Sequence, residues 1–265
     1  MVKGLAHFAE HFRPFLEHYT LIGGAACDLL HEQAGLEFRL TKDLDIVLTV
    51  DALTPEFSKV LWEYIREGEY EVRERGDGVP IFYRFKKPKK EGYPAQIELF
   101  SKMPGGLQLP EDAHITPVPV NGTIVSLSAI LLNEEYYSLV QASKIEISNI
   151  STVRSDVLMV LKATAFLGNS ARKAAGQEVR SIDIIKHKLD FFRLYRIIDP
   201  QLRLALPKQI KSDIQQFLNR MAEDKFDVRV VGIRGEDTPT VLANVTRIFE
   251  LDFEPTVAVQ ERKEQ

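Results

Sequence analysis

The chain has 265 residues but only one cysteine, Cys27. A single thiol excludes a disulfide within the chain and any metal site built from several thiolates. Proteins with so few cysteines are typical of reducing compartments, so we expect a cytoplasmic location. Metal binding, if present, must then rest on carboxylates or histidines.

Long apolar runs are also missing. The longest, residues 157–167, is interrupted by Lys162 and is far shorter than the roughly 20 residues of a membrane span. Near the start, apolar Leu5, Phe8, Phe12 and Phe15 alternate with charged residues, which predicts an amphipathic helix rather than a signal peptide. We therefore expect no membrane partner.

Positive charge is not in excess either. The 34 lysines and arginines face 38 aspartates and glutamates, a net charge of −4, which excludes a global electrostatic attraction to nucleic acid. The densest basic segment, residues 86–90 (Lys-Lys-Pro-Lys-Lys), favours an exposed turn. The alternative is a local contact with the phosphates of an RNA acceptor.

Hydrophobic periodicity predicts an α+β fold, in which a mixed sheet with flanking helices precedes a mainly helical C-terminal lobe. We place the first domain at residues 1–140 and the helical lobe at 141–265. Strands are expected at 19–22, 39–50, 70–73, 80–85, 95–100 and 227–233, and a hairpin is expected at 118–125. Helices are expected at 4–18, 25–33, 55–66, 153–167, 182–198, 207–222 and after Pro239.

Glycines mark several of the expected turns and helix ends. Gly168 is expected to end the helix that begins at residue 153. Turns are expected at residues 76–78 (Gly-Asp-Gly) and at Asn121-Gly122. A charged tail follows the last helix.

Two carboxylates give the main chemical signal. Asp43 and Asp45 lie two residues apart on an expected strand, so both point to the same face. Such close like charges repel each other unless a cation lies between them, and a hard ion such as Mg²⁺ suits them. The alternative is the solvent-facing side of an edge strand.

Two other features favour the metal site. Gly23-Gly24 joins an expected strand to a helix, where backbone N–H groups can approach a phosphate. Glu98 stands between Ile97 and Leu99 on another expected strand, and a third acid would complete a two-metal site. A tight turn and an exposed strand position are the respective alternatives.

These motifs together resemble the polymerase-β-type nucleotidyltransferase superfamily and, within it, the AbiEii-like toxins of type IV toxin–antitoxin systems. The resemblance covers most of the chain. It is carried by residues 21–28 (Leu-Ile-Gly-Gly-Ala-Ala-Cys-Asp), 39–47 (Arg-Leu-Thr-Lys-Asp-Leu-Asp-Ile-Val), 97–101 (Ile-Glu-Leu-Phe-Ser), 126–132 (Ser-Leu-Ser-Ala-Ile-Leu-Leu) and 181–194 (Ser-Ile-Asp-Ile-Ile-Lys-His-Lys-Leu-Asp-Phe-Phe-Arg-Leu).

The resemblance implies transfer of a nucleoside monophosphate from an NTP to an acceptor hydroxyl, on an RNA such as tRNA or on a protein. It also implies Mg²⁺ or Mn²⁺ and a cognate antitoxin as partner. The implied metal ligands are Asp43, Asp45 and Glu98, and the implied catalytic residues are these three with Lys162 and Asp183. The implied nucleotide-binding residues are Gly23, Gly24, Arg39, Thr41, Lys42 and Lys162.

The chain departs from the superfamily at two positions. Gly24 stands where many members have serine, so no hydroxyl can contact phosphate there, and Glu98 replaces the commoner aspartate. The longer side chain puts Glu98 in doubt as a direct metal ligand.

The two lobe residues have alternatives as well. Lys162 interrupts an apolar helix face and can simply extend its amine to solvent. Asp183, Lys186, His187 and Asp190 follow helical spacing and can form a solvated stripe with local ion pairs, opposite a buried stripe of Ile182, Ile185, Leu189 and Phe192. A catalytic role of His187 is a secondary hypothesis.

Two other functions remain open at this point. One is a non-catalytic nucleotide-binding or regulatory module, in which the acids bind metal and nucleotide without transfer. The other is a partner-binding protein that uses the acidic strand and the lysine turn as contact surfaces. NTP binding without turnover would support the first, and metal-independent partner binding would favour the second.

Overall fold

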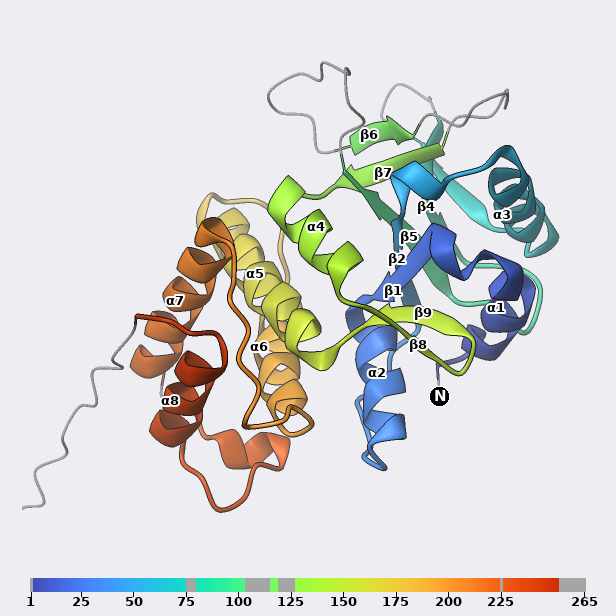
Figure 1. Ribbon diagram of the computed structural model, residues 1–265. Coiled ribbons are helices and arrows are strands. Elements are labelled where there is room, and N and C mark those ends of the chain that lie inside the picture. The colour runs from blue at the N-terminus through green and yellow to red at the C-terminus, as the bar shows by residue number, and fades with distance from the viewer. Residues whose placement is uncertain (1, 75–79, 103–114, 119–126, 225, 253–265) are drawn as a thin grey trace, which may run out of the picture. The chain divides into compact units, whose positions relative to one another are not determined.

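The computed structural model describes residues 2–74, 80–102, 115–118, 127–224 and 226–252 (Figure 1). The turns expected at 76–78 and at Asn121-Gly122 lie outside the described residues, as does the charged tail. The chain divides into two compact units, Met1–Leu158 and Met159–Gln265. The domain boundary expected between residues 140 and 141 stays a prediction.

A mixed sheet forms the first unit. Within the described residues its strands are β1 (Tyr19–Ile22), β2 (Asp43–Leu48), β3 (Glu71–Glu74), β4 (Pro80–Lys86), β5 (Gln96–Ser101), β6 (Ile115–Val118), β7 (Leu127–Leu131), β8 (Lys144–Ile147) and β9 (Ile150–Val153). Their order is β3-β4-β5-β2-β1-β9-β8, with β7 paired to β5 and β6 paired to β7. The pairs β2–β5, β1–β9 and β5–β7 are parallel and the others antiparallel. The expected mixed α+β fold is confirmed.

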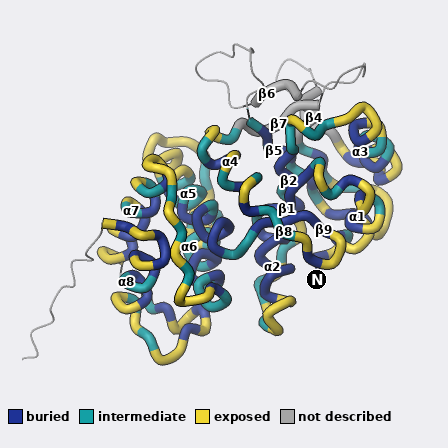
Figure 2. The backbone as a smooth tube through the Cα atoms, viewed as in Figure 1, coloured by how far each residue is buried: buried dark blue, intermediate teal, exposed yellow. Residues whose placement is uncertain are grey.

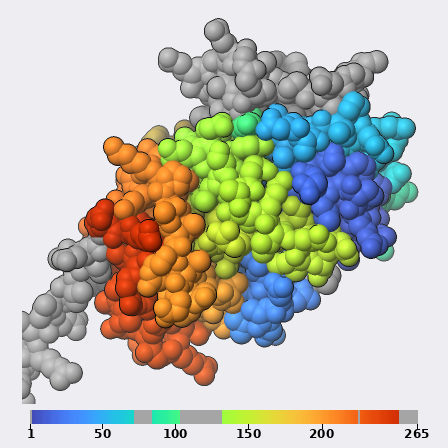
Figure 3. Space-filling model, viewed as in Figure 1, coloured from blue at the N-terminus to red at the C-terminus, as the bar shows by residue number. Residues whose placement is uncertain are grey.

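The helices of the first unit are α1 (Leu5–Phe12), α2 (Gly23–Gln33), α3 (Pro55–Glu67) and α4 (Glu134–Ala142), with the 3₁₀ helices η1 (Arg13–His18) and η2 (Val50–Ala52). The helix expected at 4–18 becomes 3₁₀ from Arg13, where Pro14 lacks the N–H that an α-helix would need. Residues of α4, β8 and β9 form a continuous yellow-green stretch of the surface in Figure 3.

An aromatic core joins α1 and α3 to one face of the sheet. Phe8 stacks on Phe12 at 4.4 Å and meets the ring edge of Tyr19 on β1 at 5.3 Å. Tyr64 of α3 contacts Phe12 at 5.2 Å. The central strands β1 and β2 are accordingly dark blue along most of their length in Figure 2. This core supports β2 from the face opposite its acids.

The second unit is helical. It contains α6 (Ser181–Tyr195), α7 (Lys208–Glu223), α8 (Thr238–Ile248), the short η3 (Val228–Val231) and most of α5 (Ser155–Ala174). Its core includes Phe191 of α6, which lies 4.3 Å from the ring of Phe217 on α7. Among the described residues, no helix combines the length and apolarity needed to cross a membrane.

Two local expectations for this region are wrong. Helix α5 runs through Gly168 and ends before Gly176, whose φ of 79° allows the N–H of Gln177 to bond the carbonyl of Arg172. The strand expected at 227–233 is instead η3, because the Asp227 carboxylate accepts from the Arg229 N–H and starts a turn there.

Candidate active site

The acid pair lies on β2, in the middle of the sheet. Leu44 and Ile46 are buried and point into the core, so Asp43 and Asp45 share the opposite face, with Asp43 exposed and Asp45 half-buried. The strand thus holds two carboxylates side by side on a backbone fixed by its core. This arrangement is the one expected from the period-two pattern.

The parallel pairing of β2 with β5 places a third acid beside them. Asp45 is opposite Glu98 and Asp43 is opposite Gln96, while Ile97 and Leu99 are fully buried on the other face. Adjacent strands are about 4.8 Å apart, so Glu98 belongs to the same polar surface as the acid pair. This register places the three acids on one face of the sheet.

The turn between β1 and α2 lies directly against Asp45. Ile22 pairs with Asp45 across β1 and β2, and Gly23 follows with a φ of 74°. A Cβ on Gly23 would lie 1.8 Å from Oδ2 of Asp45, which no side chain can tolerate. Gly23 therefore brings backbone close to the carboxylate, besides allowing the turn.

The next glycine lies near the segment that precedes β2. A Cβ on Gly24 would lie 2.6 Å from Thr41 Oγ1 and 3.4 Å from an Arg39 guanidinium nitrogen. Helix α2 begins here, and no side chain caps its N-terminus. The predicted nucleotide-binding residues Gly24, Arg39 and Thr41 are therefore close together, next to Gly23. They lie at the positive end of a helix, which favours anions such as phosphate.

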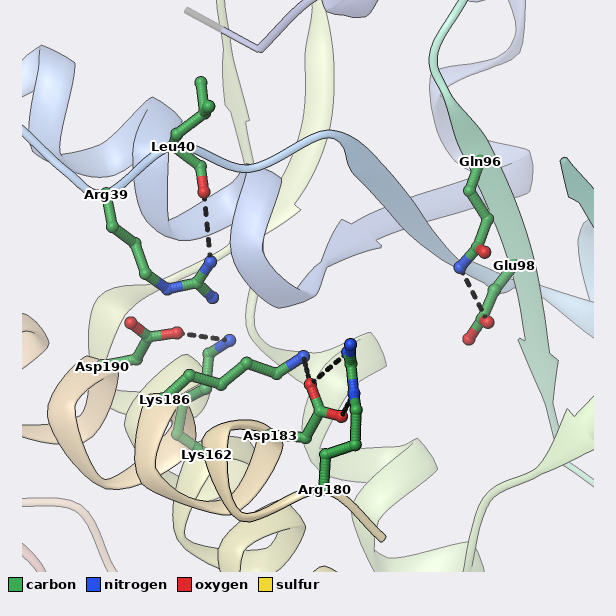
Figure 4. A network of polar contacts seen from close by, with 9 residues as sticks. All are labelled: Arg39, Leu40, Gln96, Glu98, Lys162, Arg180, Asp183, Lys186 and Asp190. Atoms are coloured by element: carbon green, nitrogen blue, oxygen red, sulfur yellow. Dashed lines mark hydrogen bonds and ion pairs between the residues drawn. The ribbon is translucent and has the colours of Figure 1, made fainter. Parts of the chain in front are cut away.

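Lys42, another predicted nucleotide-binding residue, is exposed immediately before β2. Its carbonyl accepts a hydrogen bond of 3.2 Å from the Ala95 N–H, which ties this segment to the start of β5. Arg39 donates from Nη1 to the Leu40 carbonyl at 3.4 Å (Figure 4) and lies 5.3 Å over the Phe38 ring.

Two side chains contact one oxygen of Glu98. Its Oε1 forms an ion pair with Nε of Arg84 on β4. The same oxygen accepts a hydrogen bond from Nε2 of Gln96 at 2.9 Å (Figure 4). Arg84 is directly opposite Glu98 in the antiparallel β4–β5 pair. Sequence reasoning missed Arg84, since only the strand register reveals its partner.

The fit of a divalent ion can be judged from these donors. Among the described residues, no three His, Cys, Asp or Glu side chains come together as a complete metal cage. Mg²⁺ rarely needs one, because it is commonly held by one or two carboxylates with substrate phosphates and water. Asp43 and Asp45, beside a phosphate-favouring helix end, fit such an ion.

The second unit holds the other two predicted catalytic residues, and it does not pair them. Lys162 on α5 is buried, and its Nζ lies 3.2 Å from Oδ2 of Asp190 on α6 (Figure 4). Oδ1 of Asp190 accepts from Arg193 at 3.1 Å. The alternative reading of Lys162 as a lysine reaching solvent is therefore wrong, since its amine lies inside a charged cluster.

Asp183 lies elsewhere on α6. Arg180 donates to its carboxylate at 2.8 Å and Lys186 at 3.1 Å, so the expected Asp183–Lys186 pair is present. The hydrogen bond from Arg180 holds the pKa of Asp183 below its usual value. Asp183 thus has two basic partners of its own, and the aspartate that pairs with Lys162 is Asp190.

The expected division of α6 into a solvated and a buried stripe is wrong in two respects. Asp190, assigned to the solvated stripe, is fully buried. Ile182 and Ile185, assigned to the buried stripe, are 61% and 42% exposed. Asp190 can be buried because Lys162 and Arg193 pair with its charge.

Comparison with known proteins gives only distant likeness. No protein-family model matches the sequence, and no curated protein matches it. The chain is similar to an antigenic nucleotidyltransferase-like protein from Paracoccidioides brasiliensis, with 16% identity and a TM-score of 0.39 over 83% of this chain and 87% of that chain.

Two other solved structures are similar to a comparable degree. The Megavirus polyadenylate synthase shares 12% identity with a TM-score of 0.35, over 83% of this chain and 37% of its own. The antibiotic-resistance factor ANT(2'')-Ia shares 12% identity with a TM-score of 0.36, over 82% of this chain and 90% of its own. Function is therefore inferred from the side chains of the site.

Proposed function

We propose that this chain is a nucleotidyltransferase that moves a nucleoside monophosphate from an NTP to an acceptor hydroxyl with Mg²⁺ or Mn²⁺. One observation carries the proposal: Asp43 and Asp45 share a strand face against which Gly23 brings the start of α2. Paired acids beside a helix N-terminus suit a metal-bound triphosphate.

In the reaction, the acceptor oxygen forms a bond to the α-phosphorus of the NTP while the bond to the β-phosphate bridge breaks. Pyrophosphate leaves, and the hydroxyl proton passes to a base, the role we assign to Glu98. A bound divalent ion would neutralise phosphate charge as it shifts to the leaving group. Asp43 and Asp45 would hold that ion.

Phosphate binding falls to the residues around the first turn of α2. The backbone at Gly23 and Gly24, with Thr41, can donate hydrogen bonds to phosphate oxygens, while Arg39 and Lys42 add positive charge. Lys162 and Asp183 remain predicted catalytic residues of the second unit. The Lys162–Asp190 contact makes Asp190 the better candidate for orienting that lysine.

The finer assignment rests on the motif resemblance. The segments around Gly23, Asp43, Glu98 and Asp183 resemble AbiEii-like toxins, so we propose an RNA such as tRNA, or a protein, as acceptor in the cytoplasm. A cognate antitoxin protein would then be a partner.

The test is incubation of the purified chain with α-labelled NTPs, Mg²⁺ and cellular RNA or protein. We expect label in an acceptor fraction, and Asp43→Asn should abolish it while the chain stays folded. The matched control is Asp51→Asn, which makes the same change at an exposed position beyond the other end of β2. Equal transfer by wild type and Asp43→Asn would refute the proposal.

The engagement of Glu98 by Arg84 favours a second candidate, a nucleotide-binding module without transfer. Calorimetry separates the two. Mg²⁺-dependent NTP binding that requires Asp43, together with no labelled product from any NTP, would establish the binding module instead.

A further inference from the structure

Four neighbouring strands contribute to one row across the site face. Arg84 of β4 is opposite Glu98 of β5. Glu98 is in turn opposite Asp45 of β2, and Asp45 is opposite Ile22, the last residue of β1. A cation and two anions therefore follow one another across the sheet. This order of charges decides where the Glu98 carboxylate lies.

Glu98 stands between a like charge and an opposite one. Like charges directly opposite each other on adjacent strands repel, so Asp45 disfavours a Glu98 carboxylate that leans toward β2. Arg84 attracts it toward β4, and the ion pair is only partly solvated, with side chains 24% and 13% exposed. Partial burial strengthens this attraction relative to a surface pair.

Gln96 reinforces the same orientation. It lies two residues before Glu98 on the same face and donates to the oxygen that Arg84 contacts, Oε1. Arg84 and Gln96 both contact Oε1, so Oε2 is the oxygen that we assign to the substrate. The carboxylate is fixed in direction before any substrate arrives.

We propose that Arg84 is a positioning residue, which with Gln96 directs Oε2 of Glu98 toward the acceptor hydroxyl instead of the metal held by Asp43 and Asp45. This inference rests on the proposed nucleotidyl transfer. It assigns the two functions of the acid surface to different residues. The β2 acids bind the metal and nucleotide. Glu98 accepts the proton of the acceptor hydroxyl as the new oxygen–phosphorus bond forms and the bond to pyrophosphate breaks, and it then releases that proton to water.

The test measures transfer and nucleotide binding separately. Arg84→Met should lower kcat by about 10- to 100-fold, the usual effect of losing a group that orients a site residue. The Kd for Mg²⁺ with a non-hydrolysable NTP analogue should stay within about twofold, since the β2 acids are intact. Arg66→Met, an exposed arginine on α3, is the matched control and should change neither value.

A double-variant cycle distinguishes positioning from simple stabilisation. If Arg84 acts through Glu98, then Glu98→Gln with Arg84→Met should lose no more activity than Glu98→Gln alone. Should Arg84→Met fail to fold, Arg84→Lys takes its place, with the charge kept and the guanidinium geometry lost, and the same cycle applies.

The outcomes separate the inference from the proposed function. Unchanged kcat in Arg84→Met, additive losses in the double variant, or a parallel loss of Mg²⁺–NTP affinity would overturn the positioning role while wild-type transfer stands. A wild-type chain that transfers no label overturns both, because Glu98 then has no acceptor to act on.

Discussion

Gly23 combines a positive φ with direct contact to a carboxylate, and these two properties have separate energetic consequences. The left-handed backbone costs a non-glycine residue about 1–2 kcal/mol. The contact adds a steric overlap, because a Cβ would occupy the place of Asp45 Oδ2. Relief of that overlap must displace Asp45 or the start of α2.

Gly23→Ala should therefore destabilise the chain by more than about 2 kcal/mol and abolish Mg²⁺-dependent NTP binding. Gly92→Ala is the matched control, since Gly92 has a φ of 85° with nothing within 4 Å of the added Cβ. It should show the backbone cost alone and bind nucleotide normally. Urea unfolding and calorimetry measure both effects, and normal binding by Gly23→Ala would contradict this account.

Asp190 and Asp183 lie on one helix but differ in burial, so their substitutions should differ in cost. Asp190→Ala removes the buried carboxylate that lies 3.2 Å from the Lys162 amine and should cost about 3–5 kcal/mol. Asp183→Ala removes largely solvated pairs and should cost less than about 1 kcal/mol. Urea unfolding of each variant gives the comparison, and similar costs would show that the Lys162–Asp190 contact contributes little.

At the scale of elements, one glycine inside helix α5 and one just beyond its end have opposite predicted effects. Gly168 is helical and exposed, with open space at its Cβ, so Gly168→Ala should stabilise the chain by about 0.5–1 kcal/mol. Gly176→Ala should destabilise it by about 1–2 kcal/mol, because its left-handed φ ends the helix. Thermal unfolding measures whether each variant is more or less stable than the wild type. Changes of the same sign in both variants would contradict the helix boundary.

The N-terminal elements carry a pH dependence. Burial lowers the pKa of His11 on α1 and of His18 on η1 below the ordinary 6.5. The unfolded chain then binds protons more readily than the folded one. Stability should be full above about pH 6.5 and fall as the pH drops below it. Melting temperatures between pH 8 and pH 5 test this, and His11→Gln with His18→Gln should flatten the profile.

The sequence predicts the elements that carry strong local signals. Strand β1, bounded by Gly23, and strand β2, with its alternating acids, come directly from periodicity and turn chemistry. The β8–β9 hairpin does not, because its turn is Ser148-Asn149, with φ of 50° and 60°, rather than a glycine signal. The same holds for the site. The shared face of Asp43 and Asp45 can be predicted from neighbouring residues, whereas the contact of Arg84 with Glu98 depends on the register between two strands.

At the scale of the whole molecule, the net charge limits the affinity of the chain for RNA of arbitrary sequence. Its net charge is −4, and the lysine-rich turn is largely neutralised, since Lys87 lies 3.0 Å from Glu71 and Lys90 lies 3.2 Å from Glu69. Binding to an RNA hairpin of arbitrary sequence should thus be no tighter than about 10⁻⁴ M at physiological salt.

Fluorescence anisotropy at 50 and 200 mM salt provides the measurement. Glu69→Gln with Glu71→Gln frees the lysines, so this variant should bind more tightly and with a steeper salt dependence. Micromolar, strongly salt-dependent binding by the wild-type chain would show that a basic surface elsewhere outweighs the net charge.

The parallel pairing of β2 with β5 also bears on the order of events in folding. Asp45 and Glu98 face each other only after the chain between them, with α3, β3 and β4, has closed a long loop. Helices such as α1 and the β3–β4 hairpin can form from nearby residues, whereas this contact must wait for a distant strand. During refolding, nucleotide affinity should therefore recover when β2 pairs with β5, after the helical signal has returned. Nucleotide binding would then report the last step of sheet assembly.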